Sequence, residues 1–177
     1  DGIDIKNQES AEKSLDSLKE VFGQLIKDVR TVTFNLAPPE LTDHGVTSAI
    51  RKMTNMVGNF TGHNVLYENT TEFDKRLDKN VEVNIYRIVQ EAVNNALKYS
   101  NSEYILISIS HTDSYLKIKV EDNGVGFDPE ASKEHFKGTG NGLRFMKERM
   151  GYVGGKLKIN SEKNKGTAIH IVIPLSK

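Results

Sequence analysis

The chain has 177 residues, with 24 Lys and Arg against 24 Asp and Glu, so its formal net charge at pH 7 is zero. A balanced charge argues against a broad surface for nucleic acid or an anionic membrane. The sequence lacks Cys, which excludes disulfides, thiolate metal sites and a cysteine nucleophile. No apolar run approaches the roughly 20 residues of a membrane span. Because the chain begins at Asp1 and not at Met, we expect it to be a piece of a longer protein.

The N-terminal stretch has the apolar spacing of a helix in a bundle. Intervals of four and three residues alternate along Ala11, Leu15, Leu18, Phe22, Leu25, Val29, Val32 and Leu36. This heptad spacing is typical of coiled coils and helical bundles, and Pro38 and Pro39 end the segment. We predict that residues 1–37 contain one helix of a dimerisation bundle. The alternative is a long amphipathic helix that packs on its own domain.

The rest of the sequence predicts helices packed on a sheet. Residues 38–60 have the pattern of a connecting helix, and Asp78 is a suitable N-cap for a further helix. Strands are expected at residues 63–69, 104–111, 116–122, 156–161 and 167–175, with a short helix after Leu143. Residues 61–177 should therefore form an α+β domain, a two-layer sandwich with a mixed, mostly antiparallel sheet and helices on one face.

Three polar residues on the helix after Asp78 are the first candidates for chemistry. Glu91, Asn95 and Lys98 are spaced i, i+4 and i+7, which places them on one face of an α-helix. An amide oxygen suits Mg²⁺, and an ammonium group suits a phosphate. The alternative is an ordinary solvated face.

Two strand ends carry polar residues that are expected to point inward. Asp122 has the parity of the apolar residues of its strand, and a buried carboxylate needs a partner such as a ligand amine. Thr167 has the parity of Ile169 and could share that ligand, although it also suits a strand by propensity alone. Gly124 and Gly126 would allow a flat ring to approach the backbone, but they fit a tight turn as well.

A third glycine-rich segment precedes the short helix. Gly138, Gly140 and Gly142 alternate, and Leu143 opens the helix. Bare N–H groups at a helix N-terminus favour an anion, whereas the alternative is a flexible linker. The spacing matches neither the dinucleotide-binding fingerprint nor the P-loop.

Together these motifs resemble the GHKL ATPase superfamily and, more closely, the sensor histidine kinases of two-component systems. EAVNNALKYS at residues 91–100 is similar to the N box, and DNGVGF at 122–127 and GTGNGLRFMKERM at 138–150 are similar to the two glycine boxes. NLAPPELTDHGVTSAI at 35–50 resembles the junction in kinases with a HisKA_3-type dimerisation helix, which pair with helix-turn-helix response regulators.

The resemblance implies the Bergerat ATP-binding fold, with ATP and Mg²⁺ as ligands. By analogy with the family, Asn95 would bind Mg²⁺. Glu91 would orient water or the acceptor, or bind the metal through water. Lys98 and Tyr99 would line the phosphate and ribose side.

The glycine boxes imply the rest of the site. Asp122 would recognise the adenine amino group, Thr167 would complete that contact, and Gly124 and Gly126 would flank the base. The residues implied to form the lid and phosphate cradle are Gly138, Gly140, Asn141, Gly142 and Leu143.

The implied activity is that of a protein histidine kinase, which passes the γ-phosphoryl of ATP to a histidine and then to an aspartate of a response regulator. The resemblance implies a cytoplasmic domain and a homodimer formed through the N-terminal helix, without direct nucleic-acid binding. Any membrane anchor would lie in segments upstream. The alternatives are a non-catalytic dimerisation or ATP-sensing module, an anti-sigma-type serine kinase and a gyrase-like ATPase.

No histidine of the chain matches the acceptor of the family. The five candidates are His44, His63, His111, His135 and His170. We expect the acceptor to lie upstream of Asp1, so that this chain binds ATP and Mg²⁺ but does not phosphorylate itself.

Overall fold

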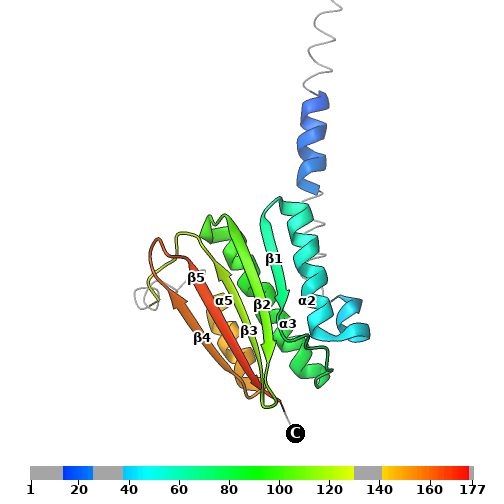
Figure 1. The fold of residues 1–177 in the computed structure, drawn as a ribbon. Helices are drawn as coiled ribbons and strands as arrows, with labels where there is room; N and C mark the ends of the chain where they lie inside the picture. Colours follow the sequence, from blue (N-terminus) through cyan, green and yellow to red (C-terminus); the bar gives the residue numbers. More distant parts are fainter. Residues whose placement is uncertain (1–13, 26–37, 130–140, 176–177) are drawn as a thin grey trace, which may run out of the picture. The chain divides into compact units, whose positions relative to one another are not determined.

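The computed structural model describes residues 14–25, 38–129 and 141–175, and it divides the chain into two compact units, Asp1–Ala37 and Pro38–Lys177. In the first unit, residues 14–25 form a helix, drawn in blue in Figure 1. Its large apolar side chains are all more than half exposed, namely Leu15, Leu18, Val21, Phe22 and Leu25. The helix is confirmed here, whereas Ala11, Val29, Val32 and Leu36 of the predicted seam lie outside the described residues.

Within its described residues, the second unit contains a five-stranded sheet. The strands are β1 (Asn64–Asn69), β2 (Tyr104–His111), β3 (Tyr115–Asp122), β4 (Lys156–Ser161) and β5 (Thr167–Pro174). Their order across the sheet is β1-β2-β3-β5-β4, in which β1 and β2 are parallel and the other pairs are antiparallel (Figure 1). The predicted mixed, mostly antiparallel sheet is confirmed.

Helices cover one face of this sheet. They are α2 (Pro39–Thr61), α3 (Lys79–Asn95), the π-helical turn η1 (Ala96–Ser100) and α5 (Asn141–Tyr152). All lie on the same side of the sheet in Figure 1. Alternate strand residues point toward them and are almost fully buried, among them Ile105, Ile107, Ile109, Leu116, Ile118 and Ile171. The core therefore lies between the sheet and a single helical layer, as predicted.

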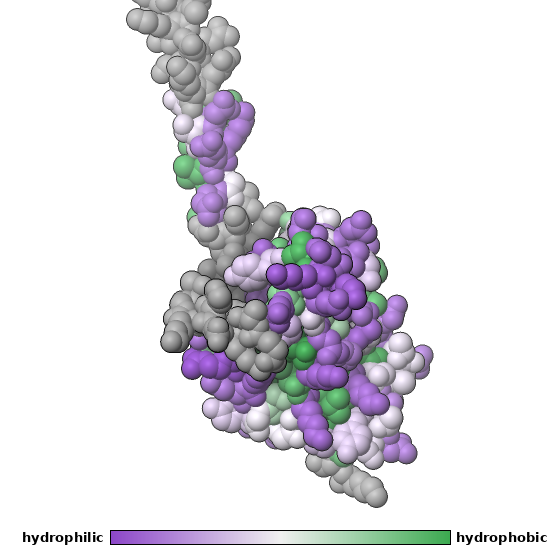
Figure 2. Space-filling view, turned by 90° about the vertical axis from the view of Figure 1, so that its left-hand side faces the viewer, coloured by the Kyte–Doolittle hydropathy of each residue, from purple (hydrophilic) through white to green (hydrophobic). Residues whose placement is uncertain are grey.

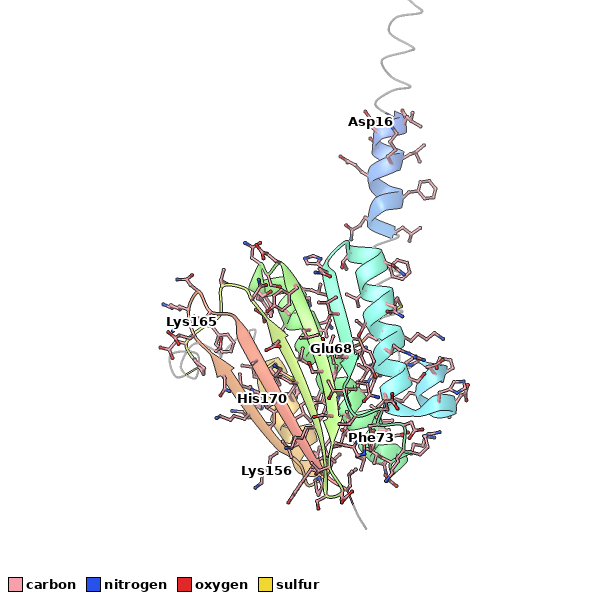
Figure 3. All side chains as sticks on the ribbon, in the orientation of Figure 1. Asp16, Glu68, Phe73, Lys156, Lys165 and His170 are labelled. Carbon is pink, nitrogen blue, oxygen red and sulfur yellow. The ribbon has the colours of Figure 1, made fainter. Side chains whose placement is uncertain are left out.

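The opposite face of the sheet is mostly polar. Glu68, Lys156 and His170 are among the side chains that the strand alternation places there (Figure 3). The side of the molecule drawn in Figure 2 is also mostly hydrophilic, with hydrophobic residues in small scattered groups. In the part of the chain that the structure describes, no helix has the length and apolar character needed to span a bilayer.

Helix α2 packs against α3 and β1, and it contains a kink at Gly45, where φ is 84°. A Cβ atom at Gly45 would lie 2.9 Å from Cδ of Arg76 and 3.0 Å from Oε1 of Glu82. Glu82 is 1% exposed and accepts hydrogen bonds from the Arg76 guanidinium and from the backbone N–H of Leu77. His44 lies in α2, directly before the kink.

The start of α3 was predicted correctly, but the π turn at its end was not predicted. The Asp78 carboxylate accepts a hydrogen bond from the Asn80 backbone N–H at 2.8 Å and caps the helix, as expected. After Asn95 the helix widens into the π turn η1, and the Ser100 hydroxyl donates to the Ala96 carbonyl at 2.7 Å. Apolar periodicity gives no signal for such a turn, although π turns are frequent at functional sites.

Candidate functional site

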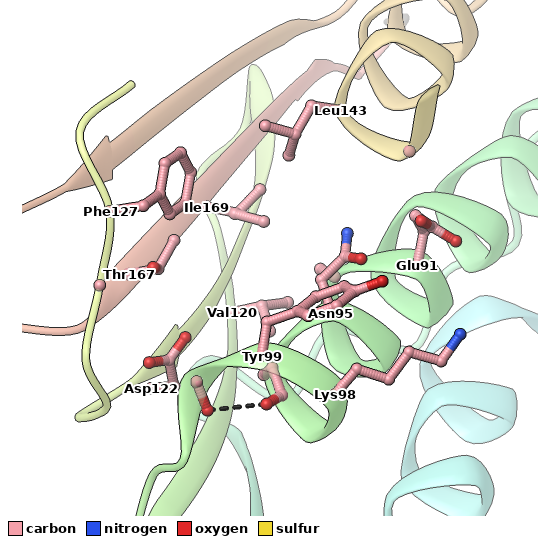
Figure 4. A pocket seen from close by; sticks show the side chains of 15 residues that line it. Glu91, Asn95, Lys98, Tyr99, Val120, Asp122, Phe127, Leu143, Thr167 and Ile169 are labelled. Atoms are coloured by element: carbon pink, nitrogen blue, oxygen red, sulfur yellow. Dashed lines mark hydrogen bonds between the residues drawn. The ribbon is translucent and has the colours of Figure 1, made fainter. Parts of the chain in front are cut away.

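A cavity of about 510 Å³ lies among α3, η1, the ends of β3 and β5, and the start of α5 (Figure 4). This volume falls within the roughly 300–1,000 Å³ of small-molecule sites. The structure brings many of the predicted residues to its wall: Glu91, Asn95, Lys98, Tyr99, Asp122, Gly126, Gly142, Leu143 and Thr167. They come from segments that are far apart in the sequence, and the fold gathers them around one cavity.

One side of the cavity carries Asp122 and Thr167 (Figure 4). These residues are register partners on β3 and β5, and the strand alternation turns both toward the helices. The Oδ1 atom of Asp122 accepts a hydrogen bond from the Gly124 backbone N–H at 2.9 Å. Burial raises the pKa of Asp122, while the backbone N–H groups of Gly124 and Thr167 act in the opposite direction. The result is a partly desolvated carboxyl group that can receive a ligand donor.

Apolar side chains line the neighbouring wall. Val120 and Ile169 form the next register pair of β3 and β5, and Phe127 and Leu143 lie near them in Figure 4. Such a surface suits the flat face of an aromatic ring. Sequence reasoning did not name Val120, Ile169 or Phe127 as site residues. The strand alternation already contained the signal for the first two, because it turns them to the same side as Asp122 and Thr167.

The other side of the cavity carries Glu91, Asn95 and Lys98 (Figure 4). The first two residues project from α3, whereas Lys98 and the 69% exposed Tyr99 belong to η1. A Cβ atom at Gly142 would collide with Oε1 of Glu91 and lie 3.4 Å from Nδ2 of Asn95. The absence of a side chain at Gly142 thus brings the first turn of α5 against these two groups.

The donor set fits a magnesium ion held together with phosphate oxygens. In the described part of the chain, no group of three or more His, Cys, Asp or Glu side chains could hold a metal ion by itself. The Asn95 and Glu91 side chains both lie beside the space left by Gly142, and an amide oxygen and a carboxylate are ligands that suit Mg²⁺. Protein sites of this kind usually leave the other positions to water and substrate phosphates.

Two of the predicted glycines have contacts within the protein. Gly124 does not line the cavity, and a Cβ atom there would collide with the Ser100 carbonyl oxygen. The next N–H, that of Val125, donates to this oxygen at 2.7 Å. Gly126 has a φ of 56°, and a Cβ atom there would collide with the Glu162 carbonyl oxygen. The bare backbone thus lets the end of β3 approach η1 and the β4–β5 turn.

The remaining lid residues are only partly described. Asn141 is the first residue of α5 and is not among the lining residues. Gly138 and Gly140 lie outside the described residues. Their implied contact with phosphate stays a prediction.

A family model described as histidine kinase-, DNA gyrase B-, and HSP90-like ATPase matches residues 80–177, which include the whole cavity lining. The chain belongs to this ATPase family. The expected family membership is therefore confirmed, and the family's name supports ATP as the nucleotide of this GHKL domain.

This chain is similar to a curated relative, the oxygen sensor histidine kinase NreB of Staphylococcus carnosus (strain TM300). The two are 34% identical over 180 residues. The match covers 97% of this chain and 49% of the relative, so the chain spans about half of the relative's length.

Solved structures share the fold. The histidine kinase domain of the Erythrobacter litoralis blue-light activated histidine kinase aligns over 73% of this chain and 61% of its own, with 19% identity and a TM-score of 0.62. The catalytic domain of histidine kinase ThkA aligns over 73% and 90%, with 18% identity and a TM-score of 0.58. These likenesses confirm the predicted GHKL fold.

Proposed function

We propose that this chain is the ATP-binding catalytic part of a sensor histidine kinase. Its family membership and its relative NreB support this function. The observation that carries the proposal is the division of the cavity, with Asp122 and Thr167 on one side and Glu91, Asn95 and Lys98 on the other. The first side suits an adenine base, and the second side suits a triphosphate with its metal ion.

Each side chain has a role that follows from its chemistry. Asp122 accepts a hydrogen bond from the adenine amino group, and the apolar wall contacts the faces of the ring. Asn95 would hold Mg²⁺, with Glu91 acting directly or through water, and the ion would neutralise phosphate charge. Lys98 adds a positive charge beside the phosphates, and the first turn of α5 adds backbone N–H groups. Catalysis would then rest on positioning and charge stabilisation.

The acceptor of the phosphoryl group is a histidine, from which the group passes to an aspartate of a response regulator. The expected homodimer would form through the exposed apolar side chains of residues 14–25, and the domain would work in the cytoplasm. We place the acceptor outside this chain, because no histidine of the sequence matches the acceptor of the family. In addition, none of the described histidines lines the cavity. The described histidines are His44, His63, His111 and His170.

The nucleotide site is tested by titrating the chain with ADP, with and without Mg²⁺, in a calorimeter. Asp122→Ala should abolish binding under both conditions because it removes the acceptor for the base. Asn95→Ala should remove only the gain in affinity that Mg²⁺ provides. Ser108→Ala on the polar face of the sheet is the matched control and should bind as the wild type does. Unchanged affinity in Asp122→Ala would refute the adenine site, and an equal loss with and without Mg²⁺ in Asn95→Ala would refute the metal assignment.

The place of the acceptor is tested with γ-labelled ATP. The chain alone should take up no stable label, whereas addition of a helix that carries an acceptor histidine should produce a labelled species on that helix. Acid-labile label on this chain alone would contradict the assignment and would direct attention to its own histidines.

A further inference from the structure

Ser161 lies beside the proposed base site, although it does not line the cavity. In the sheet register Thr167 pairs with Asp122 on one side and with Ser161 on the other. The three residues therefore form a polar row across the ends of β3, β5 and β4. The adjoining row is apolar and consists of Val120, Ile169 and Ile159.

The Ser161 hydroxyl joins three segments through hydrogen bonds. The backbone N–H of Phe127 donates to Ser161 Oγ at 2.9 Å. The same oxygen lies 3.1 Å from the Gly166 carbonyl oxygen and 2.9 Å from Thr167 Oγ1. A serine hydroxyl has one hydrogen to donate and two lone pairs to accept with. All three contacts are made at once only if Ser161 donates to Gly166 and Thr167 donates to Ser161.

This arrangement of the hydroxyl hydrogens determines whether Thr167 acts as a hydrogen-bond donor or acceptor toward a ligand. Its only hydroxyl hydrogen is directed to Ser161, so the hydroxyl oxygen of this cavity-lining residue has only lone pairs left for a ligand. Asp122 beside it has one carboxylate oxygen bonded to the Gly124 N–H and a second oxygen that can accept. This end of the cavity therefore holds hydrogen-bond acceptors side by side.

We propose that Ser161 is a positioning residue that orients the Thr167 hydroxyl as an acceptor and so makes the cavity select a 6-aminopurine over a 6-oxopurine. The inference rests on the proposed binding of ATP. An exocyclic amino group carries two N–H donors and complements the row, whereas a 6-oxo group would place an acceptor against acceptors. Unpaired polar groups of this kind give strong discrimination between ligands.

The test compares the affinities of the full chain for ADP and inosine diphosphate, measured by calorimetry. The wild type should prefer ADP. In Ser161→Ala the Thr167 hydrogen is released and can be donated to a 6-oxo group, so the ratio of the two affinities should fall about tenfold, the factor supplied by one hydrogen bond of ordinary strength. Ser161→Thr retains the hydroxyl group and should restore the ratio. Ser108→Ala on the polar sheet face should leave the ratio unchanged.

A double-variant cycle separates this role from a purely structural one. Thr167→Val should lower the ratio, and adding Ser161→Ala to it should cause no further fall, because Ser161 acts through Thr167. An equal loss of ADP and inosine diphosphate affinity in Ser161→Ala would overturn the inference, as would a further fall in the double variant. Should Ser161→Ala not fold, Ser161→Cys replaces it, since a thiol is a weak donor and acceptor of similar size.

Failure of the proposed function gives a different result. A wild-type chain that binds neither nucleotide overturns the ATP site and this inference together. A wild-type chain that binds ADP but shows no change of ratio in any Ser161 variant overturns this inference alone.

Discussion

At the scale of single residues, Asp122 shows how a ligand site and stability can oppose each other. Burial raises the pKa of its carboxyl group above the ordinary value of 3.8. A group with a raised folded-state pKa binds its proton more tightly in the folded protein than in the unfolded one. The stability that it contributes is therefore present below the unfolded pKa and is lost as the pH rises through the folded pKa. Near neutral pH the partly desolvated charge of Asp122 therefore lowers the stability of the ligand-free domain.

Asp122→Asn should therefore affect stability and binding in opposite directions. The amide oxygen can still accept from the Gly124 N–H, but the charge is gone. The variant should unfold at a higher temperature than the wild type at about pH 7, and this advantage should shrink as the pH falls through the raised pKa of the wild-type Asp122 carboxyl group, which then takes up its proton. Thermal unfolding followed by circular dichroism measures this, and ADP affinity should fall.

Asp113→Asn is the matched control for this experiment. Asp113 is exposed in the turn between β2 and β3, so its substitution should leave the unfolding temperature nearly unchanged at either pH. A difference in unfolding temperature between Asp122→Asn and the wild type that is the same at both pH values would contradict the expectation.

At the scale of elements, Gly124 and Gly142 differ in which neighbouring atoms a side chain at each position would meet. A Cβ atom at Gly124 would collide with the backbone carbonyl of Ser100, which cannot move without shifting η1. A Cβ atom at Gly142 would collide with the end of the flexible Glu91 side chain. Gly124→Ala should therefore lower the free energy of unfolding by about 1–3 kcal/mol, a usual result of overpacking.

Gly142→Ala should instead retain stability and lose function. The displaced Glu91 carboxylate would disturb the proposed metal side, so the Mg²⁺-dependent part of ADP affinity should fall. Urea unfolding and calorimetric titration of the two variants side by side measure both effects. A destabilised Gly142→Ala with normal binding would show that α5 depends on this glycine for packing alone.

The elements also show what the sequence could and could not predict. Strand alternation correctly placed Asp122 and Thr167 on the helical side, because a period of two leaves no freedom once the apolar residues are buried. The α-helical spacing of Glu91, Asn95 and Lys98 was less informative. The helix changes to a π turn after Asn95, so the arc expected for Lys98 does not apply. All three still line one cavity.

Contacts between segments distant in sequence were beyond sequence reasoning. The sequence predicted Ser161 only as the last residue of a strand, yet its hydroxyl group forms hydrogen bonds with the Phe127 backbone N–H and the Thr167 hydroxyl. Gly124 and Gly126 were expected to leave room for a ligand or to form a tight turn. Both leave room for a backbone carbonyl, that of Ser100 or Glu162, and Gly126 also lines the cavity. Each of these contacts depends on how strands pair, and local composition does not encode that pairing.

At the scale of the whole molecule, the two compact units differ in how they bury their apolar residues. The unit from Pro38 to Lys177 has a continuous core between sheet and helices, and α2 belongs to it through contacts with α3 and β1. In contrast, residues 14–25 carry five large apolar side chains that are more than half exposed. Surfaces of that kind mark association sites. Folding and nucleotide binding should therefore depend on the second unit, and self-association on the first.

Residues 38–177 alone should consequently retain the unfolding temperature and the ADP affinity of the full chain, because every described cavity residue and its support lie within that range. The full chain should self-associate in sedimentation experiments, whereas the shortened chain should stay monomeric. Phe22→Asp in the full chain should weaken association without changing ADP affinity, since Phe22 is 58% exposed and outside the cavity. A shortened chain that is unfolded, or that binds ADP more weakly than the full chain, would show that the N-terminal unit supports the nucleotide site. In that case Phe22→Asp should impair ADP binding as well.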